Sequence, residues 1–77
     1  MQKKLSELKT GEKAIIIKVQ GSGALRRRLL DMGLVRGTEI EMVRKSPLGD
    51  PLEFLVKGYN LSLRKMECEN VYVEVKQ

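Results

Sequence analysis

The sequence contains no histidine and a single cysteine, Cys68. Histidine is the commonest general base, the commonest metal ligand and the side chain that most often changes charge near neutral pH. Without an imidazole partner, Cys68 cannot form a Cys–His nucleophile pair, and one such ligand cannot build a tetrahedral zinc site. We therefore predict no catalytic residue, no metal-ligating residue and no enzymatic activity.

Phosphate-binding glycine motifs are missing as well. The chain has no G-x-x-x-x-G-K-[ST] motif, and Gly21 and Gly23 lack the third glycine of a dinucleotide fingerprint. The carboxylates that could hold a hard cation show no EF-hand spacing, and we interpret them as solvated surface. They are Asp50, Glu53, Glu67 and Glu69. These residues predict no cofactor.

Long hydrophobic segments are also absent. The longest unbroken apolar run is Ala14–Ile17, far short of the roughly 20 residues that span a bilayer. The N-terminal lysines are followed by no apolar segment of the kind found in signal peptides. One cysteine permits no internal disulfide, which is typical of a reducing compartment. The sequence predicts a cytoplasmic protein that does not insert into a membrane.

The chain has 77 residues and a net charge of +5. A chain of this length encloses little core volume, so we expect one domain over residues 1–77 with its functional site on the surface. Excess positive charge favours an anionic partner, such as nucleic acid, a membrane surface or an acidic protein. Mixed surface charges also serve solubility, so the charge alone does not select a partner.

Turn residues at short intervals separate segments in which apolar and polar residues alternate. This alternation directs one face of each strand to a shared core and the other face to water. The predicted strands lie at residues 12–20, 38–45, 52–56, 61–63 and 71–75. Five short strands can close on themselves and hide their edges. The expected fold is therefore mainly β, a small five-stranded barrel.

Residues 24–32 have helical periodicity instead. The apolar residues on one face of this helix are Leu25, Leu29 and Met32. Ser22 is the predicted N-cap and Gly33 the predicted left-handed terminator. At about 100° per residue, Leu30 lies off the apolar stripe and is expected to be exposed. A second short turn is expected at 65–68.

Two surface features are candidates for partner binding. Three consecutive arginines on the helix fan over about 200°, so they cannot all bind one phosphate; they could also form a solvated face with an Arg27–Asp31 ion pair. The loop at 46–51 is stiffened by its prolines, which suits recognition, although it could also be a plain hairpin loop. The predicted partner-binding residues are Arg26, Arg27, Leu29, Leu30, Pro47, Leu48, Gly49 and Asp50.

We expect the C-terminal half of the helix and this loop to form one contact surface. Leu30→Asp should then weaken binding of a partner while changing the free energy of unfolding little. Leu25→Asp, on the buried stripe, should instead unfold the domain.

Aromatic side chains, on which nucleic-acid bases stack, are scarce. The chain has only Phe54, Tyr59 and Tyr72, and Phe54 is assigned to the core. A small basic barrel that binds nucleic acid therefore rests on net charge alone, and sequence-specific binding is not expected.

Several segments closely resemble the FeoA family. The matching segments are LSEL at 5–8 with Gly11, LRRRLLDMGL at 25–34, Gly37, SPLGDP at 46–51 and LSLRK at 61–65. Their order and spacing agree over nearly the whole chain, so the resemblance is specific.

The resemblance implies an SH3-like β-barrel with one helix and an accessory role in bacterial or archaeal ferrous iron uptake. The implied partner is FeoB, a membrane transporter with a cytosolic GTP-binding domain. Iron or another divalent metal is commonly attached to the family name, but the residues above supply no ligand set for it. A similar barrel in iron-dependent repressors contacts other protein segments. Regulation of such a repressor therefore remains an alternative, and a weak homo-oligomer stays open.

Overall fold

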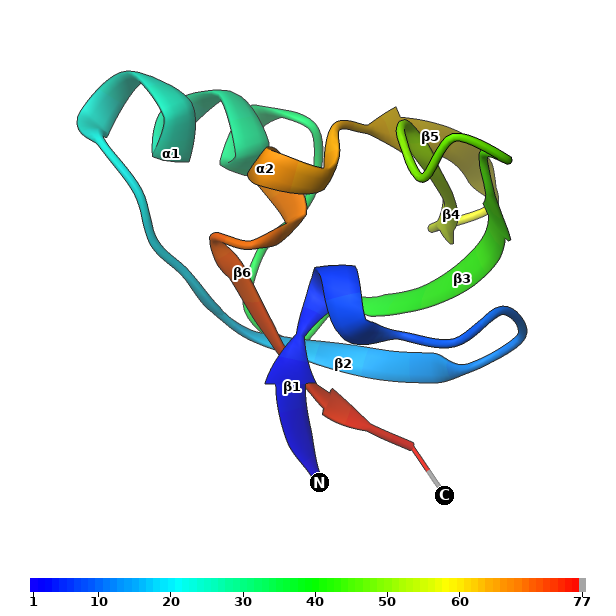
Figure 1. Cartoon of the computed structure of the whole chain (residues 1–77). Helices are drawn as coiled ribbons and strands as arrows, with labels where there is room; N and C mark the ends of the chain where they lie inside the picture. Colours follow the sequence, from blue (N-terminus) through cyan, green and yellow to red (C-terminus); the bar gives the residue numbers. More distant parts are fainter. Residues whose placement is uncertain (77) are drawn as a thin grey trace.

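The computed structural model describes residues 1–76, and within them six strands form one antiparallel sheet. The strands are β1 Gln2–Lys4, β2 Lys13–Val19, β3 Glu39–Lys45, β4 Leu52–Val56, β5 Tyr59–Leu63 and β6 Val71–Val75. Their order in the sheet is β1-β6-β2-β3-β4-β5, which places β2 between β6 and β3. The sheet curls around the core, with the helices at one end (Figure 1).

The predicted number of strands was five, and β1 is the strand that the prediction missed. It pairs antiparallel with β6, with Lys3 opposite Val73. Three residues with two lysines carry no visible apolar alternation, so the pattern could not indicate this short edge strand.

The alternating strands bury the faces that the sequence predicted. The buried apolar strand residues are Ala14, Ile16, Val19, Ile40, Met42, Leu52, Phe54, Val56, Leu63, Val71 and Val73. Leu5 and Leu8 are also completely buried, one in and one just after the 3-10 helix η1 (Leu5–Glu7). This helix contacts α2 and β6 and so closes part of the barrel.

Two β-bulges interrupt the alternation and increase the local twist of the sheet. One lies in β2 between Ile16 and Lys18, and the other in β3 between Met42 and Arg44. Because of the first bulge, the next buried residue after Ile16 is Val19, while Lys18 points to solvent.

Helix α1 (Gly23–Asp31) follows β2, one residue away from its predicted bounds, and α2 (Lys65–Cys68) is the predicted second turn. Ser22 is the N-cap but makes no side-chain hydrogen bond. Gly33 follows the helix with φ +95°, as expected of a left-handed terminator.

The burial of α1 differs from the prediction. Leu29 is completely buried, but Leu25 and Leu30 are both half-buried and both pack against the core. The helix therefore rests on the barrel with its Leu29 side, and the residues on either side of Leu29 share the contact. Leu30 is not a free surface residue, and Leu25 is not a fully buried one.

Candidate docking surface

The three consecutive arginines of α1 point to three different environments. The Arg26 Nε donates a hydrogen bond to the Val19 carbonyl oxygen at 3.1 Å. The guanidinium of Arg28 lies 2.9 Å from the Glu67 carboxylate in α2. Arg27 is exposed, and no ion pair with Asp31 forms among residues 1–76. The arginines therefore fan out as predicted, while the alternative of an Arg27–Asp31 pair is not seen among residues 1–76 and Arg28 instead bridges to α2.

Glu67 caps the start of α2 and joins this helix to α1. Its side chain is buried, and one oxygen accepts a hydrogen bond from the Arg64 backbone N–H at 2.8 Å, which caps the start of α2. The other oxygen forms the ion pair with Arg28. The carboxylate that the sequence reading assigned to solvated surface is therefore a structural anchor between the two helices.

The loop at 46–51 is also tied to α2. The Gly49 N–H donates to the Ser46 carbonyl at 2.8 Å, which closes a turn, and the Lys65 N–H donates to the Asp50 carboxylate at 2.9 Å. Asp50, predicted to bind a partner, thus already accepts a hydrogen bond from α2. Leu48, at the tip of the loop, is 93% exposed.

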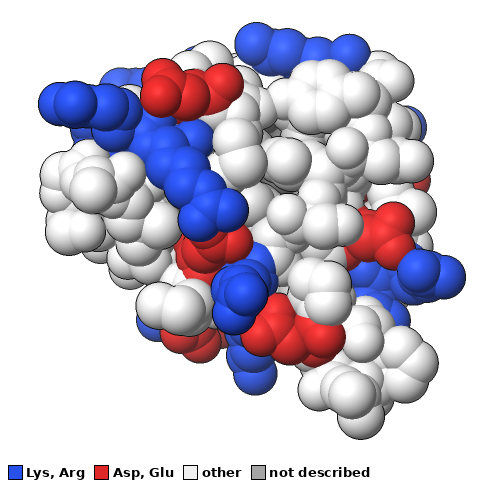
Figure 2. Space-filling view, turned by 90° about the horizontal axis from the view of Figure 1, so that it is seen from above, with Lys and Arg blue, Asp and Glu red and all other residues white. Residues whose placement is uncertain are grey.

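Helix α1, helix α2 and the loop at 46–51 consequently form one connected surface, which we call the docking face. Figure 1 shows α2 between α1 and the β5 end of the barrel. Seen from above in Figure 2, this side of the molecule carries a band of interleaved basic and acidic side chains beside a broad uncharged area. The surface predicted from the sequence consisted of the helix and the loop alone. It omitted α2, which supplies the exposed Met66. The turn predicted at 65–68, which begins at the last residue of the LSLRK segment, could have indicated that α2 belongs to this surface.

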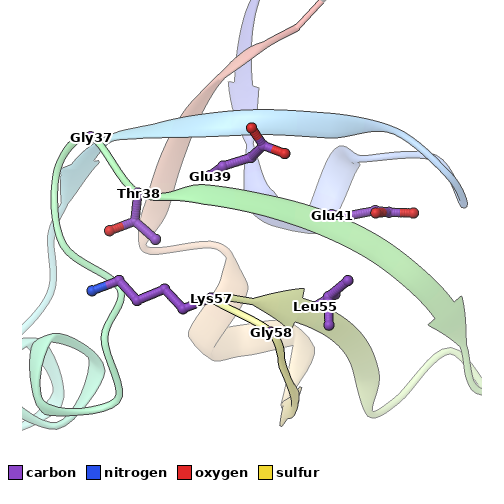
Figure 3. A pocket seen from close by; sticks show the side chains of 7 residues that line it. All are labelled: Gly37, Thr38, Glu39, Glu41, Leu55, Lys57 and Gly58. Carbon is purple, nitrogen blue, oxygen red and sulfur yellow. The ribbon is translucent and has the colours of Figure 1, made fainter.

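A separate hollow of about 420 Å³ lies on the outer side of β3 and β4. Its lining residues are Gly37, Thr38, Glu39, Glu41, Leu55, Lys57 and Gly58. In Figure 3, Glu39 points toward β2, Glu41 lies further along β3 and Lys57 extends past Thr38, so these charged groups do not converge. The Glu39 carboxylate is held by Lys76 Nζ at 2.8 Å, and this hydrogen bond keeps its pKa below the usual value. We assign no ligand to this hollow.

Ligand chemistry elsewhere in the described chain is sparse. Residues 1–76 contain no group of three or more Cys, Asp or Glu side chains placed to hold a metal ion. The Cys68 thiol is fully buried, and burial, helped by the nearby Glu67, raises its pKa to about 12. Among the aromatic residues, Phe54 is buried and the Tyr59 hydroxyl donates to the Met32 carbonyl.

None of the helices in residues 1–76 has the length and apolar character of a membrane-spanning segment.

Comparison with known proteins identifies the family. The FeoA domain model matches residues 3–75. The Fe(2+) transport protein A/Fe(2+) transporter FeoB fusion protein of Porphyromonas gingivalis is 43% identical over 72 residues. This match covers 94% of the chain but only 8% of the length of the fusion protein.

Solved structures agree with this match. The FeoA protein of Chlorobium tepidum is 44% identical with a TM-score of 0.90, covering 97% of this chain and 71% of that one. Stenotrophomonas maltophilia FeoA complexed with zinc, described as a procaryotic SH3 domain protein, is 34% identical with a TM-score of 0.82, covering 100% and 96%. A manganese-dependent transcriptional repressor shares the fold alone, at 9% identity and a TM-score of 0.90. The family match spans nearly every residue that the structure describes, and the chain therefore belongs to the FeoA family and has its SH3-like fold.

Proposed function

We propose that this chain is a cytosolic accessory protein of ferrous iron uptake that binds a FeoB-type transporter through the docking face. The observation that carries this proposal is the Porphyromonas gingivalis relative, in which a segment 43% identical to this chain belongs to a FeoA/FeoB fusion protein. Two functions fused in one chain in one organism are commonly performed by separate, associating chains in another. The family itself supplies the broader role in ferrous iron transport.

The docking face has the chemistry of a protein contact. Leu48 is 93% exposed and Met66 is 63% exposed, so this face has two large apolar side chains in contact with solvent. Methionine and arginine are enriched at protein interfaces, and an exposed leucine beside them gains free energy when a partner removes it from water. The hydrogen bonds that fix the loop to α2 reduce the conformational entropy lost on binding.

Binding of the purified chain to the cytosolic GTP-binding domain of a FeoB-type transporter tests the proposal by calorimetry. Leu48→Asp and Arg27→Glu should each weaken binding at least tenfold, or about 1.4 kcal/mol. Both residues are exposed, so the free energy of unfolding should change by only about 0.5 kcal/mol. Lys4→Glu is the matched charge reversal on β1, at the opposite end of the molecule, and should bind normally (Figure 1).

Leu30→Asp is unsuitable for this experiment, because Leu30 packs against the core and its loss would confound folding with binding. Normal binding by both docking-face variants would exclude this face. The accessory role would be overturned if the chain did not bind the transporter domain but bound a specific nucleic acid sequence at about 0.2 M salt. Non-specific binding to phosphates is weakened steeply at this salt concentration.

A further inference from the structure

In the part of the chain that the structure describes, strand β5 ends the sheet and pairs on one side only, with β4. The pair Val56–Tyr59 flanks a two-residue turn, in which Lys57 and Gly58 both have positive φ, the geometry of a tight hairpin. Hydrogen-bonded and non-hydrogen-bonded pairs alternate from this closing pair. Asn60 and Ser62 therefore occupy the positions whose backbone N–H and C=O groups point away from β4.

These outward groups are accessible. Both Asn60 and Ser62 are exposed. Among residues 1–76, no backbone group from another element hydrogen-bonds to either of them. The two residues thus present two N–H donors and two C=O acceptors to solvent. These groups have the spacing that an added antiparallel strand requires.

Natural proteins usually protect such an edge with lysine, proline or a bulge. The opposite edge follows this rule, because β1 has two lysines among its three residues. Strand β5 has the sequence YNLSL, and its register with β4 continues without a bulge. The β5 edge therefore lacks all three protective features.

The side chains of β5 favour a particular pattern in an added strand. Leu61 is half-buried and packs against the core, and Leu63 is buried on the same face. Asn60 and Ser62 lie on the outer face, as do their β4 neighbours Leu55 and Glu53. An added strand with alternating apolar and polar residues would extend the apolar rim beside Leu61 and keep its polar side chains outside.

The charges at the two ends of β5 favour an acidic strand. Residues 57–66 include Lys57, Arg64 and Lys65 but no acidic residue. Glu53, opposite Ser62, is paired with Arg44 at 2.7 Å. A second copy of the chain fits poorly, because antiparallel pairing of two β5 strands would set Lys57 of one copy against Arg64 and Lys65 of the other.

We propose that the outer edge of β5 binds an extended peptide of alternating apolar and acidic residues as a seventh, antiparallel strand. Main-chain hydrogen bonds to Asn60 and Ser62 give the affinity, and the basic ends of β5 select the acidic sequence. This strand-binding edge adjoins the docking face at Lys65, the first residue of α2, but the proposal does not depend on the identity of the transporter.

The experiment is a titration of the labelled chain with an eight-residue peptide of alternating valine and glutamate, followed by nuclear magnetic resonance. The amide signals of Asn60 and Ser62 should shift and gain protection from hydrogen exchange, while that of Leu48 should not. Ser62→Pro removes an outward N–H and leaves the β4–β5 hydrogen bonds intact, so binding should weaken at least tenfold. Ser62→Ala keeps the N–H and should bind like the unmodified chain.

A second arm leaves the protein unchanged and so does not depend on how Ser62→Pro folds. In the proposed register the glutamates lie opposite Asn60 and Ser62, and their N–H groups face β5. N-methylation of the glutamates should abolish binding, whereas N-methylation of the valines should preserve it. Equal binding of both methylated peptides, or shifts confined to another surface, would overturn the strand-binding edge. If a valine–lysine peptide binds equally well, the proposed selection of acidic residues is wrong. If the chain forms a dimer that depends on β5, the occupant of this edge is a second copy of the chain and the peptide proposal is wrong.

Discussion

Cys68 illustrates how position alone decides the chemistry of a side chain. It lies at the end of α2 with no exposed surface. Burial is the main reason that its pKa rises to about 12, and the carboxylates of Glu67, Asp50 and Glu69 act in the same direction. Because the thiolate is the reactive form of cysteine, this thiol is chemically protected as well as sterically hidden.

We predict that Cys68 in the folded chain resists alkylation by iodoacetamide at about pH 8, where an exposed thiol would react readily. Labelling should become rapid once urea unfolds the chain, and mass spectrometry distinguishes the two states. Complete labelling of folded protein within minutes would mean that the thiol is reachable without global unfolding.

At the scale of elements, the C-terminal end of α1 is fixed by a contact with β5. Gly33 has φ +95°, and a Cβ atom added there would lie 2.8 Å from the Tyr59 hydroxyl oxygen. The same hydroxyl donates a hydrogen bond to the Met32 carbonyl. The glycine therefore serves both the left-handed backbone and the close approach of the tyrosine.

Gly33→Ala should lower the free energy of unfolding by more than about 1 kcal/mol, because it strains the backbone and displaces the tyrosine hydroxyl. Gly37→Ala is the matched control, since Gly37 has φ +92° but its added Cβ would meet nothing within 4 Å. Urea denaturation should therefore show a larger loss for Gly33→Ala. In the Tyr59→Phe background the difference between the two glycine variants should shrink. If Gly33→Ala and Gly37→Ala lower the free energy of unfolding equally, both in the unmodified chain and in Tyr59→Phe, the whole effect of Gly33→Ala comes from backbone strain.

The same element shows how far periodicity could predict the structure. Apolar spacing and the flanking Ser22 and Gly33 placed the helix within one residue of α1. The spacing could not show how much of the helix is buried. Leu30 packs against the core although it lies off the predicted stripe. Alternation likewise predicted the buried faces of β3, β4 and β6. It could not indicate the bulge after Ile16, because a continuous apolar run has no polar residue to mark a shift in register.

For the candidate site, the sequence predicted the correct segments but not what joins them. Arg28 and Glu67 are 39 positions apart in the sequence, and their ion pair became apparent only when the barrel brought α2 beside α1. The hydrogen bond from Lys65 to Asp50 has the same origin. Local pattern reading finds turns and helices, whereas contacts between distant segments follow from the closure of the sheet.

At the scale of the whole molecule, paired carboxylates link stability to pH. The Lys9 backbone N–H lowers the pKa of Glu12, and the hydrogen bond from Lys76 lowers that of Glu39, both from an ordinary value of 4.5. The unfolded chain therefore binds protons at a higher pH than the folded chain does. The stabilisation is fully present above pH 4.5 and is lost as the pH falls through the lower folded pKa values.

We expect the urea midpoint to stay nearly constant from neutral pH to about pH 5 and to fall below about pH 4.5. Glu39→Gln should flatten part of this acid dependence, because the variant has no carboxylate to protonate at that position. Added salt should weaken the contribution of Glu39, since the Glu39–Lys76 pair is at the surface. A midpoint that rises on acidification would contradict the sign of both pKa shifts.

The distribution of negative charge over the molecule also bears on metal binding. Within residues 1–76, the five ion pairs use five different glutamates, Glu12, Glu39, Glu53, Glu67 and Glu74. Asp50 accepts a hydrogen bond from α2. A hard divalent cation requires about six oxygen ligands gathered at one point, so binding here would have to break several of these separate contacts.

We therefore expect a calorimetric titration of the untagged chain with iron(II) under anaerobic conditions to show no saturable one-to-one binding at micromolar concentrations. Zinc should be tested in parallel, because the Stenotrophomonas maltophilia relative is described as complexed with zinc. Zinc prefers nitrogen and sulfur ligands, and in this chain the sole cysteine is buried with a raised pKa while histidine is absent. A peptide with a known zinc ligand set provides the positive control. Tight one-to-one binding of either metal would require a rearrangement that gathers carboxylates now held apart by their own basic partners.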